Sequence, residues 1–294
     1  MFKANIFCTF AANFNAIPMK RIIPIFLACL CLTACHKTST PRGILSKDLS
    51  YSLICPDSIP TDEVYSWWSD SAKQSWIEYG NEPMEDRWFT LPEPLGFRGA
   101  DFQRFYIHYD TVYKVSDSIY HIDGRTRCKD EICTISGSLI VDSVVPFNDR
   151  LSGIDDFIMI TESGTLYAHY TLQANHNDTH IADMEGKAYF YYLVHNDSIF
   201  YDALDLVADG YCNNQYTGKW IYLDTHDTLT CNWGDFRIPE SKRLDGGCGG
   251  FIPDEAFYDN GWKTYIDRDR HGWVADPEHA YYDSIYQADI NWWK

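Results

Sequence analysis

The chain has 294 residues, of which 24 are Lys or Arg and 42 are Asp or Glu, so its formal net charge is −18 at pH 7. Nucleic-acid binding requires clustered basic side chains that neutralise phosphates, and this acidic chain has no such cluster, which argues against a nucleic-acid partner. Hydrophobic residues make up 45% and aromatic residues 16% of the sequence, enough apolar surface to offset the entropy lost on folding. The composition therefore argues against intrinsic disorder and predicts a packed globular body.

The first 34 residues form an apolar leader that contains basic residues and no acidic one. Met19 and the basic pair Lys20-Arg21 precede an apolar run from Ile22 to Leu32. That run is shorter than the roughly 20 residues that a membrane-spanning helix needs, and it is typical of a secretory signal peptide. Because Met19 begins a compact signal by itself, we expect residues 1–18 to lie upstream of the true start, although a start at Met1 stays open.

The signal ends in Leu32-Thr33-Ala34-Cys35, which resembles the lipobox of bacterial lipoprotein precursors. The resemblance covers residues 19–35 only. It implies cleavage before Cys35, acylation of the Cys35 thiol and amine, and stable anchoring by several acyl chains. We therefore expect an exported protein of the bacterial cell envelope, anchored at the outer membrane by lipid, with its membrane face left open. The alternative is an ordinary signal peptide.

Residues 35–48 are predicted to form a tether, and residues 49–294 a single β-rich domain. Within this body, six cysteines remain for disulfides in an oxidising compartment: Cys55, Cys128, Cys133, Cys212, Cys231 and Cys248. Six cysteines allow 15 connectivities, so the sequence does not fix the pairing. Spacing favours three pairs, Cys128 with Cys133, Cys212 with Cys231, and Cys55 with Cys248. A zinc site is the alternative, but no C-x-x-C spacing occurs.

Residues 62–79 have the pattern of an amphipathic helix, with apolar side chains at three- and four-residue spacing. After this helix, runs rich in β-branched and aromatic residues alternate with Asp, Asn, Ser and Gly, which predicts short strands joined by turns. The predicted strands are Phe105 to Val115, Ser118 to Ile122, Cys133 to Val145, Phe157 to Thr161, Thr165 to Gln173, Lys187 to Val194, Ser198 to Leu204, Lys219 to Leu223 and Thr228 to Trp233. We expect a mainly β fold, an antiparallel meander that forms a barrel or a sandwich, with an N-terminal helix and a loop-rich C-terminal region.

The segment from Asp267 to Glu278 resembles the calcium loop of EF-hand proteins. Asp267 and Asp269 occupy its first and third positions, Gly272 the sixth and Glu278 the twelfth. His271 stands where an oxygen ligand belongs, and no clear helix precedes the segment, so a charged loop that holds no metal is the main alternative. No other cofactor is predicted.

Motifs for catalysis are absent: the sequence contains neither a G-x-S-x-G nucleophile elbow nor an H-E-x-x-H zinc helix. His176 and His180 lie four residues apart, but the intervening Asn177 and Asp178 predict a turn in place of a zinc-binding helix. We therefore expect a protein without catalytic activity that binds an unknown carbohydrate or envelope protein, with its exposed aromatic residues at the site. An envelope structural or assembly protein is the alternative, and a hydrolase without a linear motif is a weaker one.

Overall fold

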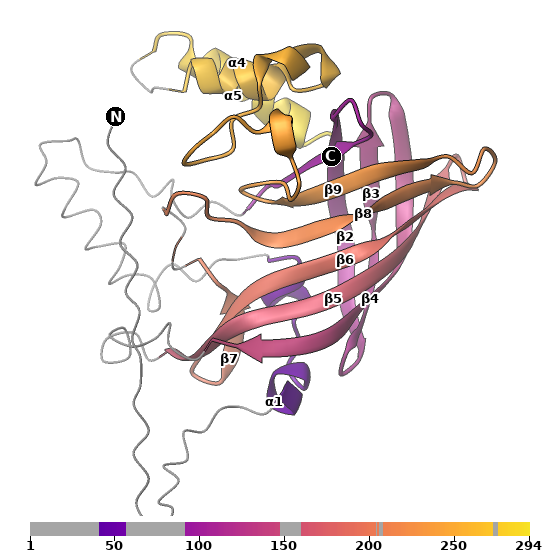
Figure 1. Cartoon of the computed structure of the whole chain (residues 1–294), viewed down its shortest axis with the longest axis vertical. Helices are drawn as coiled ribbons and strands as arrows, with labels where there is room; N and C mark the ends of the chain where they lie inside the picture. Colours follow the sequence, from indigo (N-terminus) through magenta and orange to yellow (C-terminus); the bar gives the residue numbers. More distant parts are fainter. Residues whose placement is uncertain (1–40, 57–91, 148–159, 204, 206–207, 273–275) are drawn as a thin grey trace, which may run out of the picture. The chain divides into compact units, whose positions relative to one another are not determined.

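The computed structural model describes residues 41–56, 92–147, 160–203, 205, 208–272 and 276–294. All of them belong to one compact unit, Thr38–Lys294. Its centre is one antiparallel sheet of nine strands, with short helices before and after it (Figure 1). The predicted mainly β fold is confirmed. The leader, Cys35 and the predicted helix over residues 62–79 lie outside the described residues.

The strands follow one another as a meander, and most are longer than the runs predicted from the sequence. They are β1 (Pro94–Arg98), β2 (Gln103–Ser116), β3 (Ile119–Cys128), β4 (Glu131–Pro146), β5 (Ile160–His176), β6 (Thr179–His195), β7 (Ser198–Tyr201), β8 (Asn213–Tyr222) and β9 (Thr228–Asp235).

The order of the strands closes the sheet on itself. Neighbouring strands pair in the order β5-β4-β3-β2-β1-β9-β8-β6-β7, and β5 also pairs with β6. Eight strands thus form a closed antiparallel ring, while β7 pairs with the last residues of β6. The sequence predicted a barrel or a sandwich, and this strand pairing is that of a barrel. A ring of eight strands encloses a space that side chains can fill or that one small ligand can occupy.

Local chemistry explains why these strands and turns form where they do. Along β5, buried and exposed side chains alternate, as expected of a strand with one face on a core. Asn177 and Asp178 join β5 to β6 with φ angles of 47° and 61°, the left-handed conformation that a two-residue hairpin turn requires. Asn196 and Asp197 do the same between β6 and β7.

A continuous apolar core fills the barrel interior, and two short helices at the beginning of the described chain add to it. These are α1 (Pro41–Leu45) and η1 (Ser50–Ile54), a single π-helical turn. Ile44, Leu49 and Leu53 are fully buried in the same cluster as the strand residues. Ile44 and Leu45, near the end of the predicted tether, thus pack against the core of the barrel.

A second core lies outside the barrel, where the C-terminal helices cover β1 (Figure 1). Leu95 and Phe97 of β1 pack there against Phe257, Trp262 and other buried residues. The helices are η3 (Lys242–Leu244), η4 (Glu255–Asn260), α4 (Lys263–Arg270) and α5 (His279–Ile290). The C-terminal region is thus more helical than the predicted loop-rich region. Among the described residues, no helix is long and apolar enough to cross a membrane.

One strand, β1, was not predicted, because Pro94 and Gly96 look like strand breakers; its two flanking strands hold it by backbone pairing. The strand predicted from Phe105 to Val115 is part of β2, which continues through Asp110 by a bulge where the register shifts between Tyr109 and Thr111.

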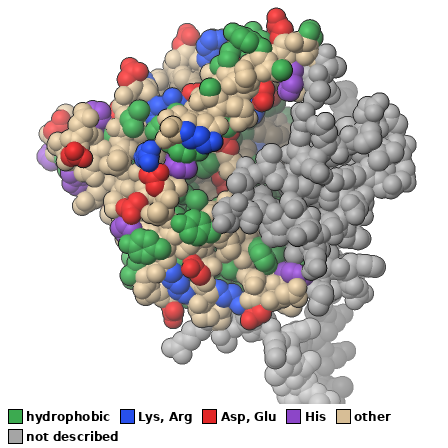
Figure 2. Space-filling model, turned by 180° about the vertical axis from the view of Figure 1, so that it is seen from behind, with side chains coloured by type: hydrophobic (Ala, Val, Ile, Leu, Met, Phe, Trp, Pro, Cys, Tyr) green, Lys and Arg blue, Asp and Glu red, His purple; other side chains and the backbone are tan. Residues whose placement is uncertain are grey.

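Three tryptophans of the described chain are core residues, so they are not the exposed aromatic residues expected at a binding surface. Trp220 lies in β8 and Trp233 in β9, and both are buried in the barrel, while Trp262 is buried in the outer core. On the face seen in Figure 2, acidic and basic side chains are interspersed with scattered apolar ones. A candidate site has to be sought in a cavity.

Candidate ligand-binding cavity

A cavity of about 510 Å³ lies where β1 begins. β1 pairs with β2 only through Gln103, Arg104 and Phe105, so from Tyr106 onward β2 pairs with β3 alone among the described strands. The cavity occupies this part of the wall. Its lining comes from the end of η1, the segment before β1, and β2, β8, β9 and the chain's last residues, and includes Cys55, Glu93, Tyr106, His108, Tyr109, Asn214, Tyr216, Trp233, Asp235, Asn291, Trp292, Trp293 and Lys294.

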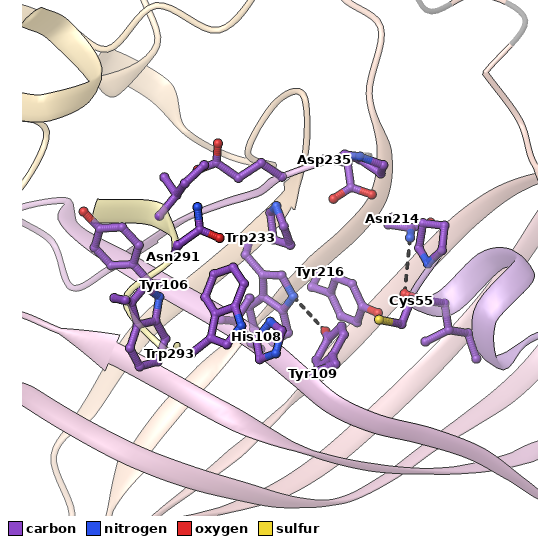
Figure 3. A pocket seen from close by; sticks show the side chains of 18 of the residues that line it. Cys55, Tyr106, His108, Tyr109, Asn214, Tyr216, Trp233, Asp235, Asn291 and Trp293 are labelled. Carbon is purple, nitrogen blue, oxygen red and sulfur yellow. Dashed lines mark hydrogen bonds between the residues drawn. The ribbon is translucent and has the colours of Figure 1, made fainter. Parts of the chain in front are cut away.

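Three aromatic side chains form the middle of the cavity (Figure 3). The rings of Tyr216 and Trp233 stack with centroids 4.6 Å apart and planes 13° apart. Trp233 Nε1 donates a hydrogen bond of 3.2 Å to the hydroxyl of Tyr109. Burial raises the pKa of Tyr109 and of Tyr216 above the ordinary tyrosine value, so both phenols stay protonated at neutral pH. They therefore present neutral, electron-rich rings to a ligand.

A bulge in β8 brings Asn214 to the cavity. The register between β8 and β9 shifts between Asn213 and Tyr216, and Asn214 has a φ of 46°. The Asn213 side chain supports this backbone, since its Oδ1 accepts from the backbone N–H groups of Tyr191 and Asn214, at 2.7 Å each. Gln215 adds a bond of 2.9 Å from Nε2 to the Asn213 carbonyl. Strained backbone held by surrounding hydrogen bonds is common at ligand sites.

Asp235 lies at the same end of the cavity as Asn214 (Figure 3). Its side chain is 4% exposed, and its Oδ2 accepts a hydrogen bond of 3.2 Å from the hydroxyl of Tyr201 in β7. Burial raises the pKa of Asp235 to about 8, and the Glu93 carboxylate nearby adds to the rise. Asp235 is consequently protonated for most molecules at pH 7.

The opposite end of the cavity is formed by Tyr106, His108, Asn291 and Trp293 (Figure 3). The ring of Trp293 stacks on His108 with centroids 4.0 Å and planes 11° apart. Burial lowers the pKa of His108, so this imidazole is neutral at pH 7. An apolar, aromatic cavity with a few polar groups at one end has the general form of a small-molecule site.

The structure places the six predicted disulfide cysteines differently from the prediction. Cys128, Cys133, Cys212, Cys231 and Cys248 are free thiols, so none of the three favoured pairs is present. Strand register explains two of the three. Cys128 pairs with Glu131, so it is diagonal to Cys133 and not opposite it. Cys212 directly precedes Asn213, which pairs with Asp235 of β9. Cys231 lies four residues along β9 from Asp235, a distance of about 13 Å, which is too far for a disulfide with Cys212.

Three of these cysteines lie inside the barrel near Arg98. Cys128, Cys133 and Cys231 are buried, and burial raises the pKa of each thiol, to about 12 for Cys133. They therefore remain protonated core thiols at neutral pH.

The glycine-rich loop before Phe251, which contains Cys248, is held by an arginine. The Arg237 guanidinium donates to the carbonyl oxygens of Gly247, Cys248, Gly249 and Gly250 at 2.7 to 3.2 Å. Arg237 also pairs with Asp245. All four contacts come from one nitrogen, Nη2, so the four carbonyl oxygens share its two N–H groups.

The predicted calcium ligands are split between two helices. Asp267 and Asp269 lie in α4, and Glu278 immediately precedes α5. The Asp267 carboxylate accepts from the Tyr258 hydroxyl and pairs with Lys263. Among the described residues no group of three or more potential ligands is placed to hold a metal ion. Calcium binding stays a prediction, and it would require calcium to displace the Lys263 ammonium.

His176 and His180 flank the β5–β6 turn, as predicted. His176 Nδ1 contacts the carbonyl oxygen of Ile132 at 2.8 Å, and His180 Nε2 contacts Asp183 at 2.8 Å. Each imidazole thus has its own partner on a strand.

No sequence motif indicates Asp235, Asn214 or the three central aromatic residues as a site. The only local signal is the run of amides Asn213-Asn214-Gln215 directly before Tyr216, which is unusual for residues that prove to be buried. Comparison with known proteins adds nothing to this picture: no protein family, no curated protein and no solved structure matches the chain.

Proposed function

We propose that this protein is a bacterial envelope lipoprotein, anchored at the outer membrane through acyl chains on Cys35, and that its barrel binds a small organic ligand in the cavity at β1. The role is binding, not catalysis. The observation that carries the proposal is the cavity itself, with its stacked aromatic rings and a buried polar end formed by Asn214 and Asp235. Sites for small molecules combine these two features.

The volume of the cavity favours one of the expected ligand classes over the other. About 510 Å³ admits a small molecule such as a single sugar or another ring-bearing compound, whereas a folded protein partner cannot enter. A ligand ring with an apolar face would gain contact energy by stacking on Trp293 or Tyr216.

Ligand screening with an aromatic truncation tests the binding role. We expect at least one compound in a panel of sugars, aromatic compounds and amines to raise the melting temperature of the purified protein, because a ligand that binds only the folded state stabilises it. For that compound, Trp293→Ala should weaken binding by about three- to tenfold, the effect of losing one aromatic contact.

Tyr281→Ala provides the matched control, since Tyr281 is 63% exposed on α5 and does not line the cavity. Equal weakening by both substitutions would contradict a site in the cavity. A panel without any stabilising compound would favour the structural alternative, which the burial of Trp220, Trp233 and Trp262 independently supports.

Lipidation is tested by a serine substitution. Cys35→Ser is expected to abolish incorporation of a labelled fatty acid and to move the protein from the detergent phase to the aqueous phase, because serine cannot form the thioether. Cys29→Ser, upstream of the predicted cleavage site, should keep both properties. Acylation that persists in Cys35→Ser and disappears in Cys29→Ser would contradict the assignment.

A further inference from the structure

The polar end of the cavity presents a hydrogen-bond acceptor with no donor. The Asn214 side chain is fixed by its amide nitrogen, which donates to the carbonyl oxygens of Leu53 at 2.8 Å and Ile54 at 3.4 Å. This arrangement defines which end of the amide is the oxygen. Asn214 is 4% exposed, and its Oδ1 has no hydrogen-bond partner among the described residues. An N–H or O–H group of a ligand would remove that deficit.

Asp235 adds a second acceptor beside it. Of its two carboxyl oxygens, Oδ2 accepts from Tyr201, and Oδ1 accepts from no described residue. No Lys, Arg or His of the described chain pairs with this carboxyl, although Asp235 is nearly fully buried. The titratable groups that face it are Glu93, Tyr109, Tyr201, Cys212 and Tyr216. None of these five groups is a base, so none of them compensates an ionised Asp235, whereas a cationic group of a ligand would.

The protein satisfies its own buried cations with the same combination of groups. Arg98 lies 4.5 Å from the ring centroid of Trp220 and pairs with Glu131 at 2.7 Å.

Arg104 lies 4.4 Å from the ring centroid of Trp262 and pairs with Glu93 at 3.0 Å. In both places an aromatic face and a carboxylate share one cation. Aromatic faces attract cations, most strongly when water is excluded.

The cavity contains these same parts, but no Lys, Arg or His of the described chain pairs with its buried carboxyl group. Tyr216 and Trp233 supply the aromatic faces, and Asp235 supplies the carboxyl group. The two basic residues that line the cavity both lie against Trp293: His108 stacks on its ring, and the Lys294 ammonium is 5.7 Å from its ring centroid.

We infer that the ligand of this cavity is an organic amine. Its protonated nitrogen pairs with Asp235 and donates a further hydrogen bond to Asn214 Oδ1, and its apolar body lies against Tyr216 and Trp233. The inference rests on the proposed function, because it assigns a chemical class to the ligand of the same cavity. Since Asp235 carries a proton at neutral pH in the empty cavity, pairing transfers that proton to solvent and leaves a carboxylate next to the ammonium group.

Matched pairs of an amine and its alcohol test the inference on the unchanged protein. We choose phenethylamine with phenethyl alcohol and tryptamine with tryptophol, and measure binding by titration calorimetry. Each amine is expected to bind at least about tenfold more tightly than its alcohol, since only the amine forms the ion pair. Alcohols that bind as tightly as the amines would overturn the inference and leave the proposed function intact. If none of the four compounds binds at millimolar concentration, the inference is overturned, whereas the proposed function is decided by the wider panel of sugars, aromatic compounds and amines.

Asp235→Asn then assigns the preference to one residue. The asparagine keeps the size of the side chain and an oxygen for the Tyr201 hydroxyl, but it cannot become a carboxylate. The preference for the amine should fall to less than about threefold, whereas Asp178→Asn, in an exposed turn with a φ of 61°, should keep the full preference. An undiminished preference in Asp235→Asn would overturn the assignment to Asp235.

Discussion

Replacement of Asp235 by asparagine is expected to raise the free energy of unfolding at pH 9 by about 5 kcal/mol and to leave it nearly unchanged at pH 4. The reason is the burial of Asp235, which raises its pKa in the folded state from 3.8 to about 8. Between these two values the folded state holds a proton that the unfolded state has released. The stability of the natural protein therefore falls as the pH rises through this window, and asparagine, which has no proton to lose, removes that fall.

Urea denaturation at pH 4, 6 and 9 measures this difference. Asp178→Asn serves as the control, because it makes the same chemical change at a side chain that is exposed in the β5–β6 turn. Asp289 also has a shifted pKa. Burial alone would raise it, but hydrogen bonds from Thr264, Tyr106 and Arg127 hold it below the usual range. This contribution is the same in both proteins, so it cancels in the comparison. A stability difference between Asp235→Asn and the natural protein that stays constant from pH 4 to pH 9 would show that Asp235 is ionised in the fold.

Trp233→Ala is expected to lower the free energy of unfolding by about 4 kcal/mol, the cost of removing a large aromatic side chain from a packed core. Trp233 is 1% exposed. Its ring stacks on Tyr216 at 4.6 Å and meets the ring of Tyr170 edge-on at 5.1 Å. Truncation would leave a void between β2, β5 and β8 and deprive the Tyr109 hydroxyl of its donor.

Trp293→Ala is the matched substitution at the rim of the cavity. Trp293 is half-buried, so its loss should cost less than about 1 kcal/mol in the same denaturation experiment. The pair separates two roles of the aromatic residues: Trp233 stabilises the barrel, and Trp293 contributes mainly to the cavity. Equal destabilisation by the two substitutions would mean that the C-terminal residues are part of the barrel core.

Several elements could be predicted from local patterns. Alternating side chains identify the strand over residues 165–173, and Asn177-Asp178 identify the turn that follows it, because both signals are contained in a few neighbouring residues. The hairpin of β8 and β9 is likewise predicted in part, since Ile221 pairs with Thr228 across the expected turn. The lengths of the strands are not: the strand predicted from Ser118 to Ile122 continues to Cys128 as β3, through polar residues that pair with β2 and β4.

The cysteines show the limit of spacing as a guide. Cys128 and Cys133 flank the β3–β4 turn as predicted, but the register places Glu131 opposite Cys128. A shift of this kind is decided by how the whole hairpin packs on the barrel, which no short segment encodes.

By itself, the sequence determined that this chain forms a mainly β body of antiparallel strands, because side-chain alternation and turn chemistry act over a few residues. Only the tertiary structure decided that β5 pairs with β6 and β1 with β9, which closes the ring. It also decided the cavity, where Tyr109, Asn214, Asp235 and Trp293 meet from distant parts of the chain. The physical reason is that pairing and burial depend on long-range register. Burial, together with Glu93, raises the pKa of Asp235 so that it stays protonated, and among the described residues Asn214 Oδ1 has no donor.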